Sequence, residues 1–284
     1  MWTAKNVASA VGAVALRVAP GLMFRWQWRQ GAGVGEIPED RWLPPSEVRD
    51  VLRMLAPVSA GCGLVRIGGA ADGGYLVPDD LVGVEALLSA GVGATWTFER
   101  DLGERFGIHA SMRDGSIGAP PGLTELQDFD RLYVAAEPGP GAVTLAEWVA
   151  AVAADGDLML QMDIEGAEID ILAAVDPAVL RRFRVVVVEF HRLPWALVDG
   201  PQGEVFRTAM RRLDRDFLPV HIHPNNCCGL RVFHGIDVPC VLEVTYLRRD
   251  RVPDSPIRIP VGHPEDRDNV PAYPSLGLPA GWPD

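Results

Sequence analysis

The 284-residue sequence has few basic residues, and its cysteines lack the spacing of a metal or redox motif. Its 26 lysines and arginines are outnumbered by 38 acids, which gives a formal net charge of −12 without any basic stripe. A surface that follows phosphates needs local positive charge, so we expect no nucleic-acid partner. The four cysteines form no CxxC pair, and the adjacent Cys227 and Cys228 are poorly placed to bond each other. We therefore expect a cytoplasmic protein.

The sequence also lacks an uninterrupted hydrophobic run long enough to cross a membrane. Residues 7–24 are mostly apolar, but Arg17 and Pro20 interrupt them, and no small-residue signal cleavage site follows. This segment is too hydrophobic to stay solvated as a free helix. We expect residues 1–60 to be an N-terminal helical extension that packs on the domain or on a second copy of the chain. Contact with a membrane surface is the less favoured alternative, because an acidic body is repelled by anionic lipid.

Apolar strands and amphipathic helices alternate between residues 61 and 250, which predicts one α/β domain. Apolar runs predict strands at residues 86–90, 108–112, 132–136, 158–162, 185–190, 217–222 and 238–246. We expect the fifth of these strands, at residues 185–190, to be fully apolar. The last two have no helical segment between them, so we expect them to pair as an antiparallel hairpin. The prediction is a seven-stranded doubly wound Rossmann-like sheet, followed by a proline-rich tail at residues 251–284.

A glycine-bearing turn, SAGVG, follows the first predicted strand of the sheet. Gly91 and Gly93 would let a ligand lie close to the end of that strand. Asp114 comes at the end of the next strand, where a carboxylate can accept hydrogen bonds from both hydroxyls of a ribose. The absence of a GxGxxG fingerprint favours a nucleoside without a diphosphate, and S-adenosylmethionine is such a ligand. An ordinary strand-to-helix turn followed by a surface acid is the alternative.

Two acids follow the fourth predicted strand, in the sequence LMLQMDIEGAE. Ligands of open parallel sheets bind beyond the carboxyl ends of the strands, so we expect Asp163 and Glu165 in the crevice. His191 ends the neighbouring strand, about 4.8 Å away, where it could share a ligand or a cation with Asp163. We expect Asp163, His191 and Glu165 to be catalytic, either as a His–Asp base pair or around Mg²⁺ or Mn²⁺ held by Asp163 and His191. The alternative for Glu165 and Glu168 is that they merely favour the positive end of a helix.

The sixth predicted strand ends in HIHPNN, which places polar side chains along the acceptor side of the crevice. His221 and His223 share one face of the strand because side chains alternate. Three strand spacings, roughly 14 Å, separate Asp163 from His223, so one cation could bind both only if a loop folded back. Glu243 in the last strand is expected to be the buried partner of one of these histidines, because an unpaired buried acid is costly. We expect the acceptor-binding residues to be His221, His223, Asn225 and Asn226. The alternative for each histidine is a hydrogen-bonded structural role.

Six strings in this order resemble the FkbM-type family of S-adenosylmethionine-dependent O-methyltransferases. They are DGGYLVPDDL at 72–81, LLSAGVGATWTFERDL at 87–102, LQMDIEGAE at 160–168, VVEFHRL at 187–193, HIHPNN at 221–226 and LEVTYLRRD at 242–250. The resemblance implies the class I methyltransferase fold and methyl transfer to a hydroxyl of a small molecule, commonly a sugar or a natural product. Many methyltransferases carry an acid at the position of Ser89, and Glu99 or Asp72 could supply that charge here. The expected cofactor-binding residues are Asp72, Gly73, Gly74, Ser89, Gly91, Gly93, Glu99 and Asp114.

Two other functions stay open from the sequence. Asp163 and Glu165, together with the histidines, could hold a divalent metal for a glycosyl or phosphoryl transferase, but the sequence has neither a P-loop nor a basic cluster to hold a diphosphate. The chain could also be a non-catalytic nucleoside-binding assembly subunit, which the acids and histidine at the strand ends argue against. The resemblance favours O-methylation of a small-molecule hydroxyl, as in natural product biosynthesis, with S-adenosylmethionine as the cofactor.

Overall fold

The computed structural model describes residues 37–93, 95–152, 154–279 and 281–283. Most of the predicted N-terminal extension, including residues 7–24, lies outside the described residues. The described part of the extension contains helix α3 (Pro45–Arg53), which buries an apolar face against the domain. No helix among the described residues is both long enough and apolar enough to span a membrane.

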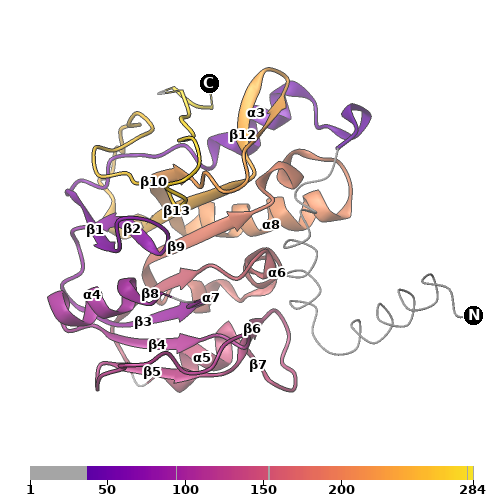
Figure 1. Ribbon diagram of the computed structural model, residues 1–284. Coiled ribbons are helices and arrows are strands. Elements are labelled where there is room, and N and C mark those ends of the chain that lie inside the picture. Colours follow the sequence, from indigo (N-terminus) through magenta and orange to yellow (C-terminus); the bar gives the residue numbers. More distant parts are fainter. Residues whose placement is uncertain (1–36, 94, 153, 280, 284) are drawn as a thin grey trace, which may run out of the picture.

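A seven-stranded sheet forms the centre of the molecule (Figure 1). Its strands, in spatial order, are β10 (Phe217–Pro224), β13 (Val241–Arg248), β9 (Phe183–His191), β8 (Asp157–Met162), β3 (Val84–Ala90), β4 (His109–Arg113) and β5 (Gln127–Asp130). Strand β13 is antiparallel to both of its neighbours, and the other neighbouring strands are parallel. This order confirms the predicted α/β fold, a doubly wound Rossmann-like sheet of seven strands that ends in an antiparallel pair.

Shorter strand pairs and helices surround the sheet. The pairs are β1 (Leu64–Gly68) with β2 (Gly74–Pro78), β6 (Tyr133–Ala135) with β7 (Ala142–Thr144), and β11 (Leu230–Phe233) with β12 (Ile236–Pro239). The α-helices after α3 are α4 (Thr97–Phe106), α5 (Leu145–Ala151), α6 (Ala167–Ala174), α7 (Pro177–Leu180) and α8 (Pro201–Asp216). Short 3₁₀ turns are η1 (Glu39–Arg41), η2 (Leu193–Leu197) and η3 (Arg249–Arg251).

The predicted position of the third sheet strand is wrong. Strand β5 occupies residues 127–130, whereas β6, at residues 133–135, pairs with β7 outside the main sheet. The sequence of β5 is QDFD, and only its first residue is buried, because the strand lies at the edge of the sheet. A search for apolar runs therefore passes over β5 and selects the more hydrophobic segment that follows it.

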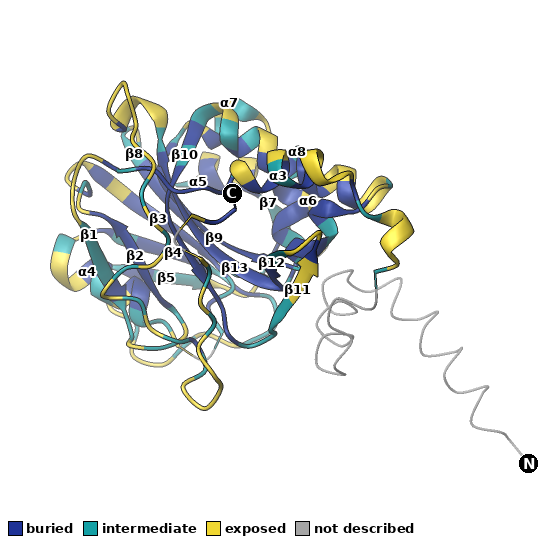
Figure 2. Cartoon of the chain, turned by 90° about the horizontal axis from the view of Figure 1, so that it is seen from above, coloured by how far each residue is buried: buried dark blue, intermediate teal, exposed yellow. Residues whose placement is uncertain are grey.

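Side-chain alternation along the central strands divides the core into two layers, which Figure 2 shows on either side of the buried sheet. Val186 and Val188 of β9 pack in the layer that contains α5, α6 and α8. Val185 and Val187 pack in the layer that contains α4 and the β1–β2 hairpin. Strand β9 is thus buried on both faces, as is usual in parallel sheets. The same period of two places Glu189 on the hairpin side of the sheet.

The proline-rich tail folds back against the β10 edge of the sheet, where Figure 1 draws it in yellow. Nε2 of His221 lies 2.9 Å from Oδ1 of Asp266 in the tail. The amide of Asn226 donates to the carbonyl of Val270 at 3.0 Å, and the N–H of Val270 donates to Oδ1 of Asn226 at 2.8 Å. The tail therefore wraps the domain, which is one of the arrangements that its proline content allows.

Candidate active site

The carboxyl ends of β3 and β8 meet at Gly91, where the predicted cofactor turn touches the predicted catalytic segment. Gly91 has a φ of +85°, and a Cβ atom placed on it would lie 1.7 Å from the carbonyl oxygen of Asp163. Only glycine fits this position, because any side chain would force the two strand ends apart. The N–H of Asp163 in turn donates to the carbonyl of Ala90 at 3.0 Å. The turn and Asp163 are thus held side by side.

Asp114 is fixed against the glycine turn by three hydrogen bonds. Its Oδ2 accepts the N–H of Gly93 at 3.1 Å, and its Oδ1 accepts the N–H and the hydroxyl of Ser116 at 2.7 Å and 2.6 Å. The carboxylate is oriented at the end of β4 and leaves lone pairs for a further donor. The structure therefore brings Gly93 and Asp114 together, and the binding of a ribose by this pair stays a prediction.

Ser89 and Glu99, two further predicted cofactor residues, belong to a buried network. Oγ of Ser89 lies 2.5 Å from Oε1 of Glu99 and 2.9 Å from Oε1 of Gln161. A hydroxyl carries one proton, so Ser89 can donate to only one of these oxygens. Ser89 Oγ donates to Oε1 of Glu99, and burial raises the pKa of this carboxyl although the hydrogen bond from Ser89 lowers it. A role for the pair in binding the cofactor stays a prediction.

Asp72, Gly73 and Gly74 lie in or beside the turn of the β1–β2 hairpin. The turn is tight, since a Cβ atom on Gly74 would lie 2.1 Å from the carbonyl oxygen of Gly69. The N–H of Gly69 donates to Oγ1 of Thr97, which ties the hairpin to the first turn of α4. This placement brings Asp72 close to acids of β9 and β13, described below, and its predicted contact with the cofactor stays a prediction.

His191 is oriented by Glu168, an acid at the start of α6. One carboxylate oxygen of Glu168 lies 3.1 Å from Nδ1 of His191 and also accepts the backbone N–H of His191 at 3.0 Å. The other oxygen accepts the N–H of Gly166 at 2.7 Å, and Glu168 is fully buried. The ring therefore turns its Nε2 toward Oδ1 of Asp163, at 3.6 Å, and toward Oε2 of Glu165, at 3.7 Å. The structure thus gathers the three residues predicted to be catalytic.

The close spacing of these groups shifts the pKa values of His191 and Asp163. Burial alone would lower the pKa of His191, but the negative charges of Glu168, Glu189 and Asp163 raise it to about 10. Burial raises the pKa of Asp163 to about 7, even though His191 acts in the opposite direction. The imidazole is therefore positively charged at neutral pH and compensates the acids around it.

A row of ionisable side chains crosses the sheet from Asp163 toward its edge. Glu189 of β9 is the direct register partner of Glu243 of β13, and Glu243 is the partner of His223 of β10. Glu243 is buried and lies beside His223, as predicted, but the hydrogen bond to its Oε1 comes from Asn269, so its partnership with a histidine stays a prediction. The prediction that β9 is fully apolar is wrong, because Glu189 is one of its buried residues. The signal was present, since an acid inside the run VVVVEFH is costly to bury without a role.

The predicted acceptor residues contact the tail and the sheet in the structure. Asn225 donates from Nδ2 to Oε1 of Glu189 at 2.7 Å, and His221 and Asn226 bond the tail. Nδ1 of His223 lies 3.9 Å from Asp266, another tail residue. These contacts favour the structural alternative for His221, and binding of an acceptor by the four residues stays a prediction.

Cys227 and Cys228 are joined by a disulfide, so the expectation that they do not bond each other is wrong. Adjacent cysteines are closer at Cα than the usual range for disulfides, which is why spacing argues against the bond. Here the pair lies in a turn in which the N–H of Cys227 donates to Oδ1 of Asn225 at 2.9 Å.

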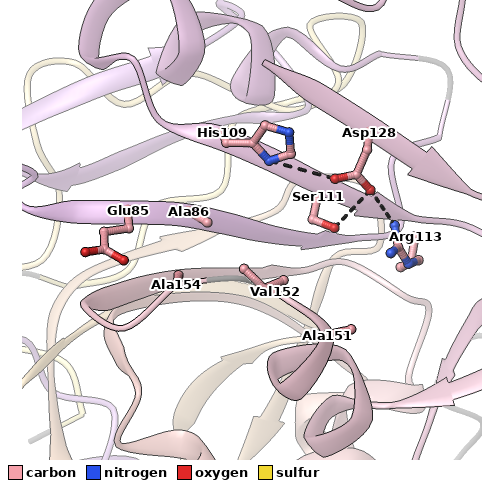
Figure 3. A pocket seen from close by; sticks show the side chains of 9 residues that line it. All are labelled: Glu85, Ala86, His109, Ser111, Arg113, Asp128, Ala151, Val152 and Ala154. Carbon is pink, nitrogen blue, oxygen red and sulfur yellow. Dashed lines mark hydrogen bonds and ion pairs between the residues drawn. The ribbon is translucent and has the colours of Figure 1, made fainter. Parts of the chain in front are cut away.

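A surface pocket of about 320 Å³ lies apart from these residues, between strands of the β3–β5 half of the sheet and the end of α5 (Figure 3). Its polar groups satisfy one another, because Asp128 contacts His109, Ser111 and Arg113 at 3.8, 3.0 and 2.8 Å. None of the predicted site residues lines it. The pocket therefore does not mark the candidate active site.

Comparisons with known proteins give weak likenesses. No protein-family model and no curated protein matches the chain. Among solved structures, the methyltransferase CalO6 is 11% identical over 57% of this chain and 57% of its own length, with a TM-score of 0.28. The chain thus matches little more than half of CalO6. A mutant of the 16S rRNA (adenine(1408)-N(1))-methyltransferase from Catenulisporales acidiphilia is 14% identical over 68% of this chain and 100% of its own, with a TM-score of 0.31. At these scores the likenesses support no conclusion about activity or substrate.

Proposed function

We propose that the protein is an S-adenosylmethionine-dependent O-methyltransferase that acts on a hydroxyl of a small molecule, such as a sugar or a natural product. The observation that carries the proposal is the contact at Gly91, which joins the glycine turn directly to Asp163. The Gly93–Asp114 pair would hold a nucleoside, and the acceptor would lie beside the Asp163–His191 pair. The two ligands would therefore bind next to each other, at the ends of neighbouring strands.

The first half of the site suits the nucleoside end of the cofactor. Bound S-adenosylmethionine supplies a methyl group that its sulfonium already activates, so the protein mainly aligns an in-line attack. Asp114 is held by Gly93 and Ser116 in one orientation, from which its free lone pairs can accept the ribose hydroxyls. Gly91 and Gly93 present backbone without side chains at this end of the sheet.

The second half of the site suits removal of a proton from the acceptor. An aliphatic hydroxyl is a poor nucleophile until its proton is taken up. Asp163 is the group that would take that proton, because its Oδ1 lies 3.6 Å from Nε2 of the positively charged His191, which would stabilise the carboxylate. Glu168 is a positioning residue, because it holds the other ring nitrogen of His191.

The clustering of Asp163 and His191, which predicts a Mg²⁺ or Mn²⁺ site, can be explained without a metal ion. Their ligand atoms lie within 4.8 Å of each other and of Glu189, which is close enough for a shared ion. However, His191 already contributes a positive charge among these acids, and its Nδ1 is engaged by Glu168. We therefore assign proton transfer, rather than metal binding, to this pair.

Methyl-labelled S-adenosylmethionine tests the proposal when it is incubated with the full chain and a panel of sugars and polyhydroxylated natural products. We expect label on a hydroxyl oxygen of at least one acceptor, and we expect Asp163→Asn and His191→Gln to lower the rate by about 100-fold or more. Asp254→Asn, which changes an exposed acid at the start of the tail, is the control and should keep the wild-type rate. Label found only on nitrogen would contradict O-methylation, and rates unchanged in both site variants would contradict the assigned pair.

A further inference from the structure

A second cluster of acids lies beside the Asp163–His191 pair, and the proposed methyl transfer does not use it. Asp72 comes from the turn before β2, Glu189 from β9 and Glu243 from β13. Each offers one carboxylate oxygen, and these oxygens all lie within 4.8 Å of one another. Glu189 and Glu243 are only 3% and 6% exposed, whereas Asp72 is exposed and opens the cluster to solvent.

This cluster lacks a cation of its own. Within the part of the chain that the structure describes, no salt bridge reaches any of the three carboxylates. Arg66 and His223 act on Glu243 only through space, because Arg66 donates to backbone carbonyls and His223 faces Asp266. Buried carboxylates at this spacing repel one another unless something positive lies among them. His191 has that role in the neighbouring cluster and also lies close to Glu189, whereas the group that bonds Asp72 and Glu243 is a neutral amide.

The neutral amide belongs to Asn269 in the C-terminal tail. Its Nδ2 donates to Oδ1 of Asp72 at 3.2 Å and to Oε1 of Glu243 at 2.5 Å, so it bridges two of the acids. The tail thus brings a polar group to the place where the carboxylates converge. Turning the amide by 180° would replace these donors with a carbonyl oxygen, which is a common ligand of hard cations.

Buried polar atoms without partners gather at this cluster. Oε2 of Glu189 accepts no hydrogen bond from the described residues, although Asn225 fixes the other oxygen of the same carboxylate at 2.7 Å. Oδ1 of Asn269 and Nε2 of His223 are buried and unpartnered as well. Buried polar atoms are almost always paired in folded proteins, so three such atoms around one cluster indicate a ligand that completes it.

We propose that Asp72, Glu189 and Glu243 form a binding site for a divalent cation of the Mg²⁺ and Mn²⁺ class, with Asn269 at its tail side. Carboxylate and amide oxygens are the ligands that these cations prefer, and the triad contains no thiol or imidazole that would select zinc. The exposed side at Asp72 leaves coordination positions for water or for oxygens of a bound molecule. The site is separate from the proton-transfer pair, although Glu189 is close to both, and the inference does not rest on the proposed methyl transfer.

Titration of the full chain with Mn²⁺, followed by electron paramagnetic resonance of the free ion, tests this site without cofactor or acceptor. We expect saturable Mn²⁺ binding that Mg²⁺ displaces. Asp72→Asn should weaken that binding by about tenfold or more, because it removes one charged ligand. Asp72 is exposed, so this variant should fold. Glu243→Gln removes the charge of a buried ligand and should weaken Mn²⁺ binding as well. Asn269→Asp should tighten binding, because it adds a carboxylate at the tail side.

Two controls locate the ion. Glu125→Gln removes an exposed acid elsewhere and should leave Mn²⁺ affinity unchanged, while Asp163→Asn should weaken binding less than Asp72→Asn does, because Asp163 belongs to the neighbouring cluster and acts on Glu189 through space. Absence of Mn²⁺ binding at millimolar concentration would overturn the proposal. So would binding that is lost in Asp163→Asn but kept in Asp72→Asn, because the ion would then lie at the His191 cluster.

Discussion

One oxygen of Glu168 lies 3.1 Å from Nδ1 of His191 and 3.0 Å from its backbone nitrogen, so a single buried acid fixes both the strand end and the ring. This contact decides that Nε2, rather than Nδ1, faces Asp163 and Glu165. From the sequence, Glu168 had only the role of an acid in the first turn of a helix. The structure makes it the residue that orients the proposed proton-transfer pair.

Glu168→Gln tests this positioning role. The amide is similar in shape but can place an N–H where the ring nitrogen needs an acceptor, so the imidazole loses its fixed orientation. We expect kcat for methyl transfer to fall about 10- to 100-fold, the range seen when partners that orient an active-site histidine are removed. The affinity for S-adenosylhomocysteine should change by less than about threefold.

Asp170→Asn is the matched control on the same helix, because Asp170 is an exposed acid two residues further along α6. It should leave kcat unchanged. If Glu168→Gln weakened cofactor binding as much as it lowered kcat, its effect would be a general disturbance of the fold, and the positioning role would be wrong.

Asp114→Ala tests the cofactor end of the site. The substitution removes an oriented carboxylate that is expected to accept hydrogen bonds from the ribose, and such bonds to a charged group contribute about 1.5–3 kcal/mol. We expect calorimetry to show S-adenosylhomocysteine binding weakened by that amount in a protein that remains folded by circular dichroism. Unchanged affinity would remove Asp114 from the cofactor site.

The arrangement of the sheet could be predicted because it depends on local patterns. The lack of a helix between residues 222 and 238 was enough to predict the antiparallel terminal pair. The turn SAGVG and Asp114 follow successive strands, and parallel strand ends meet at one edge, so their contact was also predictable. Asp163 and His191 were placed together by the same argument.

Other parts of the site depend on long-range contacts that no local pattern encodes. Asn269 reaches Asp72 and Glu243 only because the tail folds back across the sheet. Glu189 could have been noticed, since the run VVVVEFH contains an acid, but its neighbours follow from the strand register. The edge strand β5 was missed because an edge position permits the polar sequence QDFD.

Gly91→Ala tests the contact between the two halves of the site. A Cβ atom there would overlap the carbonyl oxygen of Asp163, and the φ of +85° adds strain for any other residue. We expect urea unfolding to show a loss of stability at least about 2 kcal/mol greater than for Gly107→Ala. Gly107 is a suitable control because its φ is also positive, at +68°, but nothing lies within 4 Å of its added Cβ. Equal losses of stability in the two variants would contradict this, because the ends of β3 and β8 could then move apart at no cost in free energy.

Glu99 should make the stability of the protein depend on pH. Burial raises its pKa in the folded state above the ordinary value of 4.5, so the folded protein retains a proton that the unfolded chain has lost. The stabilisation is fully present below pH 4.5 and is lost as the pH rises through the folded-state pKa. We expect urea unfolding between pH 4 and pH 8 to show this decline in the wild type and a smaller decline in Glu99→Gln. Parallel pH profiles for the two proteins would show that Glu99 is charged in the folded state.

Calorimetric titration of the full chain with S-adenosylhomocysteine tests the central claim most directly, because it requires neither the acceptor nor the cation. The account predicts saturable binding in the micromolar range at one site per chain, weakened in Asp114→Ala and unchanged in Glu125→Gln. A folded wild-type protein that shows no binding at millimolar S-adenosylhomocysteine would contradict the assignment of a methyltransferase.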